Sequence, residues 1–101
     1  MSEDTRLRPT AGARFLLERS ADRGASADYR GVIFTPTATF TTTATLVEDG
    51  AFTVGPSGAP ADLDAMLAMQ AKLLARGVAK RREDGLPAWP ARLLRWRGPG
   101  R

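Results

Sequence analysis

The chain has 101 residues, the size of one typical domain, and its 43% hydrophobic and 26% charged residues are ordinary for a globular protein. It contains neither histidine nor cysteine. That absence removes the commonest general base, the strongest side-chain nucleophile and the usual transition-metal ligands, so we predict a protein that is not an enzyme and holds no metal or cofactor. The polar N-terminus and the lack of a long apolar run predict a cytoplasmic protein without a membrane span.

The net charge of +4 is unevenly distributed along the chain. Residues 1–71 carry six basic and nine acidic side chains, a balance of −3, whereas residues 72–101 carry nine basic and two acidic ones, a balance of +7. A basic C-terminal third is typical of a solvated helix end, and also of a surface that contacts nucleic acid, an anionic membrane or an acidic protein.

The N-terminal third predicts an arm followed by two strands. Residues 1–12 are polar and without periodicity, so we expect a flexible arm. Residues 13–19 and 29–34 are rich in strand-forming side chains. The small and polar residues between them, 20–28, predict a loop. Pro36 ends the second strand because proline has no amide hydrogen to donate to a ladder.

A threonine occupies every second position from 35 to 45. This period of two predicts a strand over residues 37–47, with a row of threonines on one face and mostly apolar side chains on the other. We expect Phe40, Ala44 and Leu46 to face the core. Residues 48–50, Glu-Asp-Gly, then predict a tight turn, and residues 51–54 a short strand that returns antiparallel to the previous one.

The period changes to that of a helix after Pro60, which suits a helix start, and the pattern runs to about residue 83, before Gly85. Gly77 falls within this helix, where it costs about 1 kcal/mol relative to alanine. Acidic residues near the start and basic residues near the end complement the helix dipole. The expected buried stripe consists of Leu63, Met66, Leu67, Gln70, Leu73, Leu74 and Val78.

The C-terminal stretch allows two interpretations. Pro90 can open a short helix that carries Leu93, Leu94 and Trp96, or the run Arg-Leu-Leu-Arg-Trp can form a last strand. Residues 98–101 predict a frayed tail.

Together these elements predict a single α+β domain over residues 13–97. We expect an antiparallel meander of three to five strands, one long amphipathic helix packed on one face, and then a short basic C-terminal segment. With Phe15 and Phe34 on one side of the sheet and Leu16 and Ile33 on the other, both faces carry apolar residues. This predicts that a second copy or another protein covers the second face.

The leading functional hypothesis is a small non-enzymatic interaction module that associates with itself through its sheet, as a dimer or larger homo-oligomer. A strand without charges at the margin of a sheet can pair with a second copy. The expected self-association strand contains Thr37, Thr39, Thr41 and Thr43. No pattern in the sequence indicates a small-molecule substrate.

The alternative hypothesis is a nucleic-acid-binding protein. Lysine and arginine side chains can contact phosphates, and tryptophans can stack on bases. The same tryptophans can instead pack on the sheet while the arginines cap and solubilise the chain. The order of four strands and a long helix is similar to that of single-stranded nucleic-acid binders of the Pur and transcriptional-coactivator kind, a likeness of element order alone. The expected contact residues are Arg76, Lys80, Arg81, Arg82, Trp89, Arg92, Arg95, Trp96 and Arg97.

Overall fold

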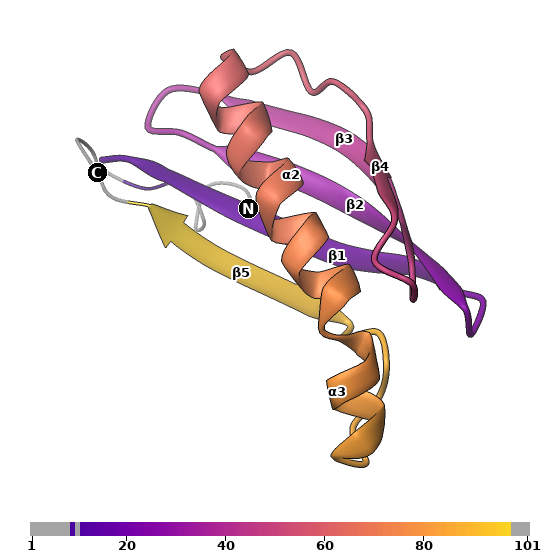
Figure 1. Cartoon of the computed structure of the whole chain (residues 1–101). Helices are drawn as coiled ribbons and strands as arrows, with labels where there is room; N and C mark the ends of the chain where they lie inside the picture. The colour runs from indigo at the N-terminus through magenta and orange to yellow at the C-terminus, as the bar shows by residue number, and fades with distance from the viewer. Residues whose placement is uncertain (1–8, 10, 98–101) are drawn as a thin grey trace.

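The computed structural model describes residue 9 and residues 11–97. Most of the expected arm over 1–12, and the whole tail over 98–101, lie outside the described residues. The described elements are β1 (Ala13–Asp22), β2 (Ser26–Phe34), β3 (Thr39–Val47), β4 (Phe52–Val54), α2 (Ala61–Arg76), α3 (Val78–Glu83) and β5 (Arg92–Arg97). The strands form one antiparallel sheet in the order β4-β3-β2-β1-β5, and α2 crosses one face of it (Figure 1). The predicted α+β class is therefore confirmed.

The first hairpin is longer than the sequence indicates. Strand β1 continues to Asp22 and β2 starts at Ser26, so the loop predicted over 20–28 is wrong. A short turn replaces it, in which the Gly24 amide donates to the Asp22 carboxylate at 2.9 Å and Gly24 takes a φ of 83°. Small and polar residues are weak strand formers, but here the pairing of β1 with β2 supplies their backbone hydrogen bonds.

Strand β3 has the alternation that its threonines predict. Ala44 and Leu46 are buried, and Phe40 packs against the core. The turn over 48–50 and the return strand β4 also form as predicted, with Gly50 at a φ of 99°. The strand begins at Thr39 instead of residue 37, because the Thr35 hydroxyl and the backbone of Ala38 close a turn before it.

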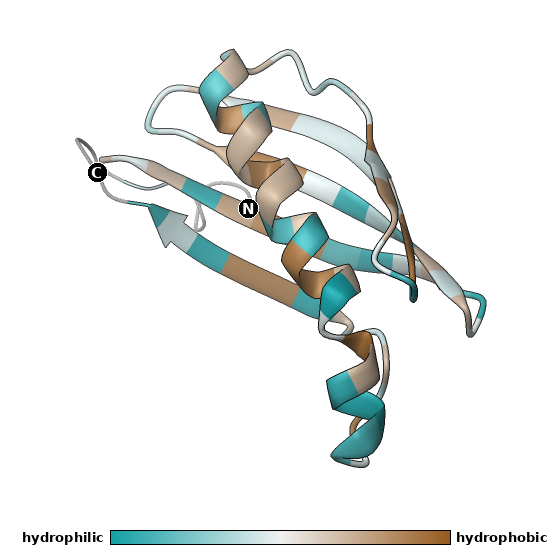
Figure 2. Ribbon diagram, in the orientation of Figure 1, coloured by the Kyte–Doolittle hydropathy of each residue, from teal (hydrophilic) through white to brown (hydrophobic). Residues whose placement is uncertain are grey.

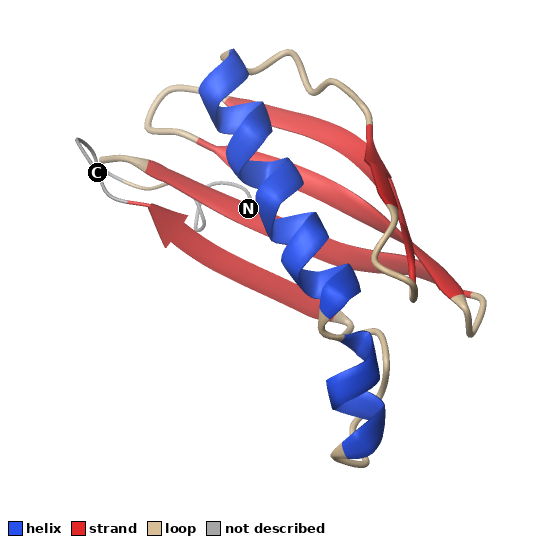
Figure 3. Ribbon diagram, in the orientation of Figure 1, coloured by secondary structure: helices blue, strands red, loops and turns tan. Residues whose placement is uncertain are grey.

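The ambiguous C-terminal stretch is a strand. Strand β5 pairs antiparallel with the free side of β1, where Leu93 lies opposite Leu17. The chain reaches this edge by crossing the sheet along α2 and α3, which the ribbons of Figure 3 show as one helical path with a bend between two segments. The sheet thus gains its fifth strand at the margin far from β4.

The helical region matches the prediction in extent, running from Ala61 to Glu83 with a bend at Gly77. Its buried stripe is different, because Leu73 is 60% exposed whereas Ala71 and Ala75 are buried. The alanines allow close approach to the sheet, and Leu67 packs where Gly31 has no side chain. A Cβ added to Gly31 would lie 3.1 Å from Leu67 Cδ2. Leu63, Met66, Leu67, Leu74 and Val78 of the predicted stripe do lie in or against the core, whereas Leu73 was placed there wrongly because hydrophobicity alone favours it over alanine.

Both faces of the sheet are apolar, but the predicted grouping of residues is wrong. Phe15 lies opposite Ile33 in the β1–β2 register, so these two share the face that α2 covers. Leu16 and Phe34 belong to the helix-free face, where they form a second buried cluster. Because the two strands run antiparallel, cross-strand partners share a face, and the sequence does not reveal the register. Neither helix in the described part of the chain is long and apolar enough to cross a membrane.

Candidate interaction surface on α2 and β5

The residues predicted to contact nucleic acid separate into four places. Arg76 is exposed near the end of α2. Lys80, Arg81 and Arg82 lie on α3, and Trp89 is buried in the loop that follows it. The remaining residues lie on β5, where alternation places Arg92 and Trp96 on the helix-free face and Arg95 and Arg97 on the helix-covered face.

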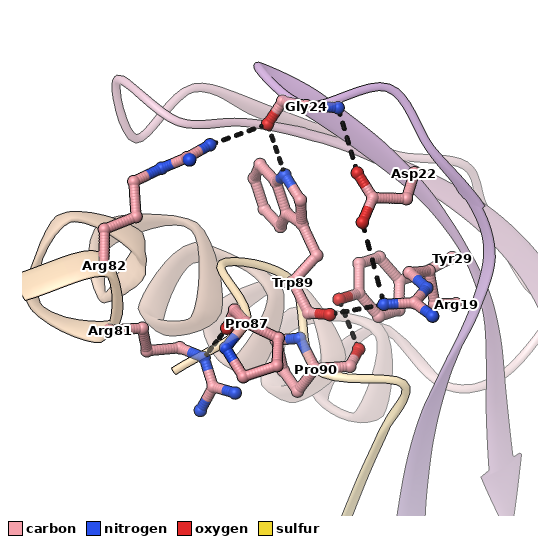
Figure 4. A network of polar contacts seen from close by, with 9 residues as sticks. All are labelled: Arg19, Asp22, Gly24, Tyr29, Arg81, Arg82, Pro87, Trp89 and Pro90. Atoms are coloured by element: carbon pink, nitrogen blue, oxygen red, sulfur yellow. Dashed lines mark hydrogen bonds and ion pairs between the residues drawn. The ribbon is translucent and has the colours of Figure 1, made fainter. Parts of the chain in front are cut away.

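Trp89 holds the loop before β5 against the β1–β2 turn (Figure 4). The residue is 1% exposed, and its indole N–H donates to the Gly24 carbonyl at 2.8 Å. Arg82 donates to the same carbonyl at 2.9 Å. Arg19 of β1 donates to the Trp89 carbonyl at 2.7 Å. Because this ring is buried and its indole N–H is already hydrogen-bonded, Trp89 is not available to stack on bases.

The same region uses further polar groups to hold the loop. The Tyr29 hydroxyl donates to the Pro90 carbonyl at 2.6 Å, and Arg81 Nε donates to the Pro87 carbonyl at 2.7 Å. Burial raises the pKa of Tyr29 to about 12, a rise that the positive charges of Arg19 and Arg81 reduce. We refer to these contacts among Arg19, Gly24, Tyr29, Arg81, Arg82, Pro87, Trp89 and Pro90 as the Trp89 network.

Two basic groups of α3 are also paired. Arg82 contacts the Glu48 carboxylate at 2.9 Å, and Lys80 contacts Asp84 at 3.1 Å. These ion pairs are exposed and contribute little individually. They do, however, neutralise part of the positive charge that the sequence concentrates on this helix.

The arginines of β5 are differently placed. Neither Arg95 nor Arg97 has a carboxylate partner among the described residues. Trp96 is 57% exposed, and its indole N–H donates to the Ala11 carbonyl at 3.2 Å. In Figure 2 the apolar middle of β5 is flanked by hydrophilic positions at both ends. This strand therefore presents apolar surface and unpaired positive charge together.

The outer edge of β5 is partly closed to strand addition. The Arg19 amide donates to the Ala91 carbonyl at 2.9 Å, and hydrogen-bonded pairs alternate along an antiparallel ladder. By this alternation the backbone of Leu94 points away from β1, toward the outer edge. Arg95 Nη1 donates to the Leu94 carbonyl at 3.0 Å. A charged side chain thus occupies the acceptor that an added strand needs.

A groove lies between α2 and β5. Its larger part has a volume of about 500 Å³ and its smaller part about 250 Å³. Gln70, Leu73 and Arg95 line both parts, so the two lie next to each other. The Gln70 Oε1 atom is buried and has no hydrogen-bond partner among the described residues. The other lining residues are Phe15, Ala65, Met66, Met69, Trp96 and Arg97 in the larger part and Leu74, Gly77, Arg81, Pro90 and Leu93 in the smaller part.

The groove is a consequence of covering five strands with one helix. Strands lie about 4.8 Å apart, so the sheet is about 19 Å wide, whereas a helix with its side chains is about 10 to 12 Å across. Helix α2 packs on β1, β2, β3 and β4, and leaves β5 at the margin (Figure 1). Met69 and Leu73, on the helix beside this margin, are 54% and 60% exposed.

The threonines predicted to mediate self-association lie near the opposite margin. Thr37 falls in the turn before β3, and Thr39, Thr41 and Thr43 share the helix-free face. Strand β3 is second from the edge, and β4 pairs with it only from Ala44 to Leu46. Beyond this pairing the Thr43 carbonyl accepts from the Gly55 amide at 3.1 Å and the Thr42 hydroxyl donates to the Gly55 carbonyl at 2.7 Å, so the part of β3 before Thr42 forms the margin of the described sheet.

The apolar side chains of the helix-free face are not open to a partner. Leu16, Val32 and Phe34 are each at most 1% exposed within the single chain, and Leu94 packs against them. The argument that a second copy must cover these residues therefore fails. The largest side chain exposed on this face is Trp96, at its β5 margin.

No family model, curated protein or solved structure matches the chain. One feature of the sequence does indicate the groove. Met69 lies just off the main apolar stripe of the helix and so makes that stripe wider. The groove as a whole was not foreseen, since it depends on which strand the helix leaves uncovered. The described residues contain no group of three or more carboxylates placed to hold a metal ion.

Proposed function

We propose that the protein is a non-enzymatic interaction module that binds another protein chain through the surface formed by α2 and β5. The observation that carries this proposal is the pair Met69 and Leu73, each more than half exposed on one side of the same helix. Single exposed apolar residues are common, but these two are one helical turn apart and border a largely apolar groove. Adjacent apolar side chains of this size are typical of contact surfaces.

Site-specific photo-crosslinking tests this proposal. Leu73 and, in a separate variant, Leu86 are replaced by benzoyl-phenylalanine in cells that express the full chain. Leu86 is the matched control because it is 50% exposed but lies in the loop after α3, away from the groove. We expect a discrete covalent adduct from position 73 and none from position 86. Equal adducts from both positions, or none from either, would contradict the proposal.

Self-association through Thr37, Thr39, Thr41 and Thr43 stays a prediction. The β3 margin offers a short run without charged side chains, which supports it. A charge placed at Thr41 tests it, because Thr41 is exposed in the single chain. Loss of association in Thr41→Lys, with an unchanged adduct at position 73, would assign association to the sheet margin.

Nucleic-acid binding is a second candidate, now restricted to β5. Arg95 and Arg97 have no carboxylate partner among the described residues, and both line the larger part of the groove together with the exposed Trp96. Fluorescence anisotropy with labelled single-stranded and duplex oligonucleotides at about 50 and 200 mM salt tests this candidate, because phosphate contacts weaken steeply over that range. Salt-sensitive binding that is lost in the double variant Arg95→Gln/Arg97→Gln supports it. No binding at the lower salt excludes it.

A further inference from the structure

We infer that a second copy of the chain is the partner that fits this surface, with the two α2 helices antiparallel about a two-fold axis at Met69. This inference rests on the proposed function and names its partner. It concerns one exposed face of α2, which we call the α2 stripe. The stripe consists of Asp62, Ala65, Met69, Leu73 and Arg76, all exposed in the single chain.

The members of the α2 stripe share one face of the helix. Successive members are three or four residues apart, which is the spacing of neighbours on a helical surface. The buried residues Leu67, Ala71 and Leu74 belong to the face that packs on the sheet. Helix α2 therefore has a second row of apolar side chains, and the fold of the single chain does not cover it.

The stripe is self-complementary in size. Ala65 and Leu73 each lie four residues from Met69, on opposite sides of it. In an antiparallel pair with its axis at Met69, this residue meets its own copy, and each Ala65 meets the Leu73 of the other chain. A small residue opposite a large one lets the two helix surfaces interdigitate.

The stripe is also self-complementary in charge. Asp62 and Arg76 each lie seven residues from Met69, so the same pairing brings each Asp62 opposite the Arg76 of the other chain. Neither side chain has an ion-pair partner among the described residues. A parallel pair in register would instead place Asp62 against Asp62, which is repulsive. Charge thus selects the antiparallel arrangement.

The dimer is expected to be weak and reversible. From Asp62 to Arg76 the helix rises about 21 Å, and the stripe is narrow, which places the contact at the low end of specific interfaces. Met69 and Leu73 also line the groove, so the second copy covers part of it. Association is therefore to be measured over a wide range of concentration.

Sedimentation equilibrium of the purified full chain, from about 10 µM to about 1 mM, tests the inference. We expect the apparent mass of the wild-type chain to rise toward twice that of the monomer. Met69→Glu places two like charges at the axis, and we expect it to remain monomeric. Asp62→Arg and Arg76→Asp each create two like-charge contacts, and we expect each to weaken association about tenfold. The double variant Asp62→Arg/Arg76→Asp restores both ion pairs and should associate like the wild type.

The controls separate association from folding. Leu86→Glu adds the same charge outside the stripe and should leave association unchanged. Because Asp62 and Arg76 also suit the helix dipole, circular dichroism of each dilute variant checks that α2 still forms. A wild type that stays monomeric up to 1 mM overturns the inference, as does a dimer that Met69→Glu leaves intact. If the wild type stays monomeric, a position-73 adduct whose mass differs from that of two copies of this chain still supports the proposed function. The absence of any position-73 adduct removes the proposed function as well.

Discussion

The two tryptophans of the basic C-terminal third are seven residues apart, yet their surroundings are opposite. Trp89 is 1% exposed and bonded at its indole N–H to the β1–β2 turn, and arginines on either side of it donate to backbone carbonyls. Trp96 is 57% exposed, and the arginines beside it have no described carboxylate partner. Tryptophan and arginine side chains thus stabilise the fold in the first segment, whereas in the second they lie on the surface.

The difference arises from what each segment must connect. The loop around Trp89 joins a helix end to an edge strand, and its carbonyls need donors that a regular ladder does not supply. Arg19, Tyr29 and Arg81 supply them. Strand β5 has the inner side of its backbone bonded to β1, and the hydrogen bond that Arg95 donates goes to its own strand, at the exposed outer edge, instead of joining two segments. An arginine-rich sequence therefore indicates a binding surface only where the arginines have no structural partner.

The largest expected effect is on folding stability when Trp89 is truncated. We expect Trp89→Ala to lower the free energy of unfolding by about 3 to 5 kcal/mol, because it removes a fully buried ring and leaves the Gly24 carbonyl with one donor fewer. The matched change Trp96→Ala should cost about 1 kcal/mol or less, since that ring is already largely solvated. Urea denaturation of both variants measures the difference, and equal losses would contradict the contrast between the two segments.

Much of the fold can be predicted from the sequence because it depends on local patterns. The threonine alternation of β3, the turn at Gly50 and the helical period after Pro60 all correspond to observed elements. The register of β1 on β2 and the exposure of Leu73 cannot be predicted in this way, because they depend on contacts between residues that are distant in the sequence. For the same reason the groove could not be predicted, since it needs both the strand order and the path of α2.

The second prediction uses the single tyrosine of the chain. Burial raises the pKa of Tyr29 to about 12, so the folded chain keeps this proton while the unfolded chain releases it near pH 10. The contribution of protonated Tyr29 to the free energy of unfolding is intact below about pH 10 and is lost as the pH rises toward 12. We expect this linkage to lower the free energy of unfolding by about 2 to 3 kcal/mol over that range.

Two measurements check this pH dependence. Tyrosinate absorbance of the folded chain reports Tyr29 alone, and its midpoint should lie near pH 12. Tyr29→Phe should cost about 1 kcal/mol at neutral pH, because the Pro90 carbonyl loses its donor, and should remove the extra loss of stability above pH 10. A midpoint near pH 10 in the folded chain would show that the Trp89 network does not enclose the phenol.

The smallest expected effect comes from replacing one arginine of each segment by glutamine. This pair of variants compares the Trp89 network with β5 most directly, because the substitution is the same in both. Arg19→Gln removes the 2.7 Å hydrogen bond to the Trp89 carbonyl and should cost about 1 kcal/mol. Arg95→Gln removes a bond to the exposed edge of its own strand and should change the free energy of unfolding by no more than about 0.5 kcal/mol. If Arg95 proved as costly as Arg19, the arginines of β5 would be structural as well. Nucleic-acid binding through β5 would then lose its main support, which is that Arg95 is not needed for folding and can contact phosphates.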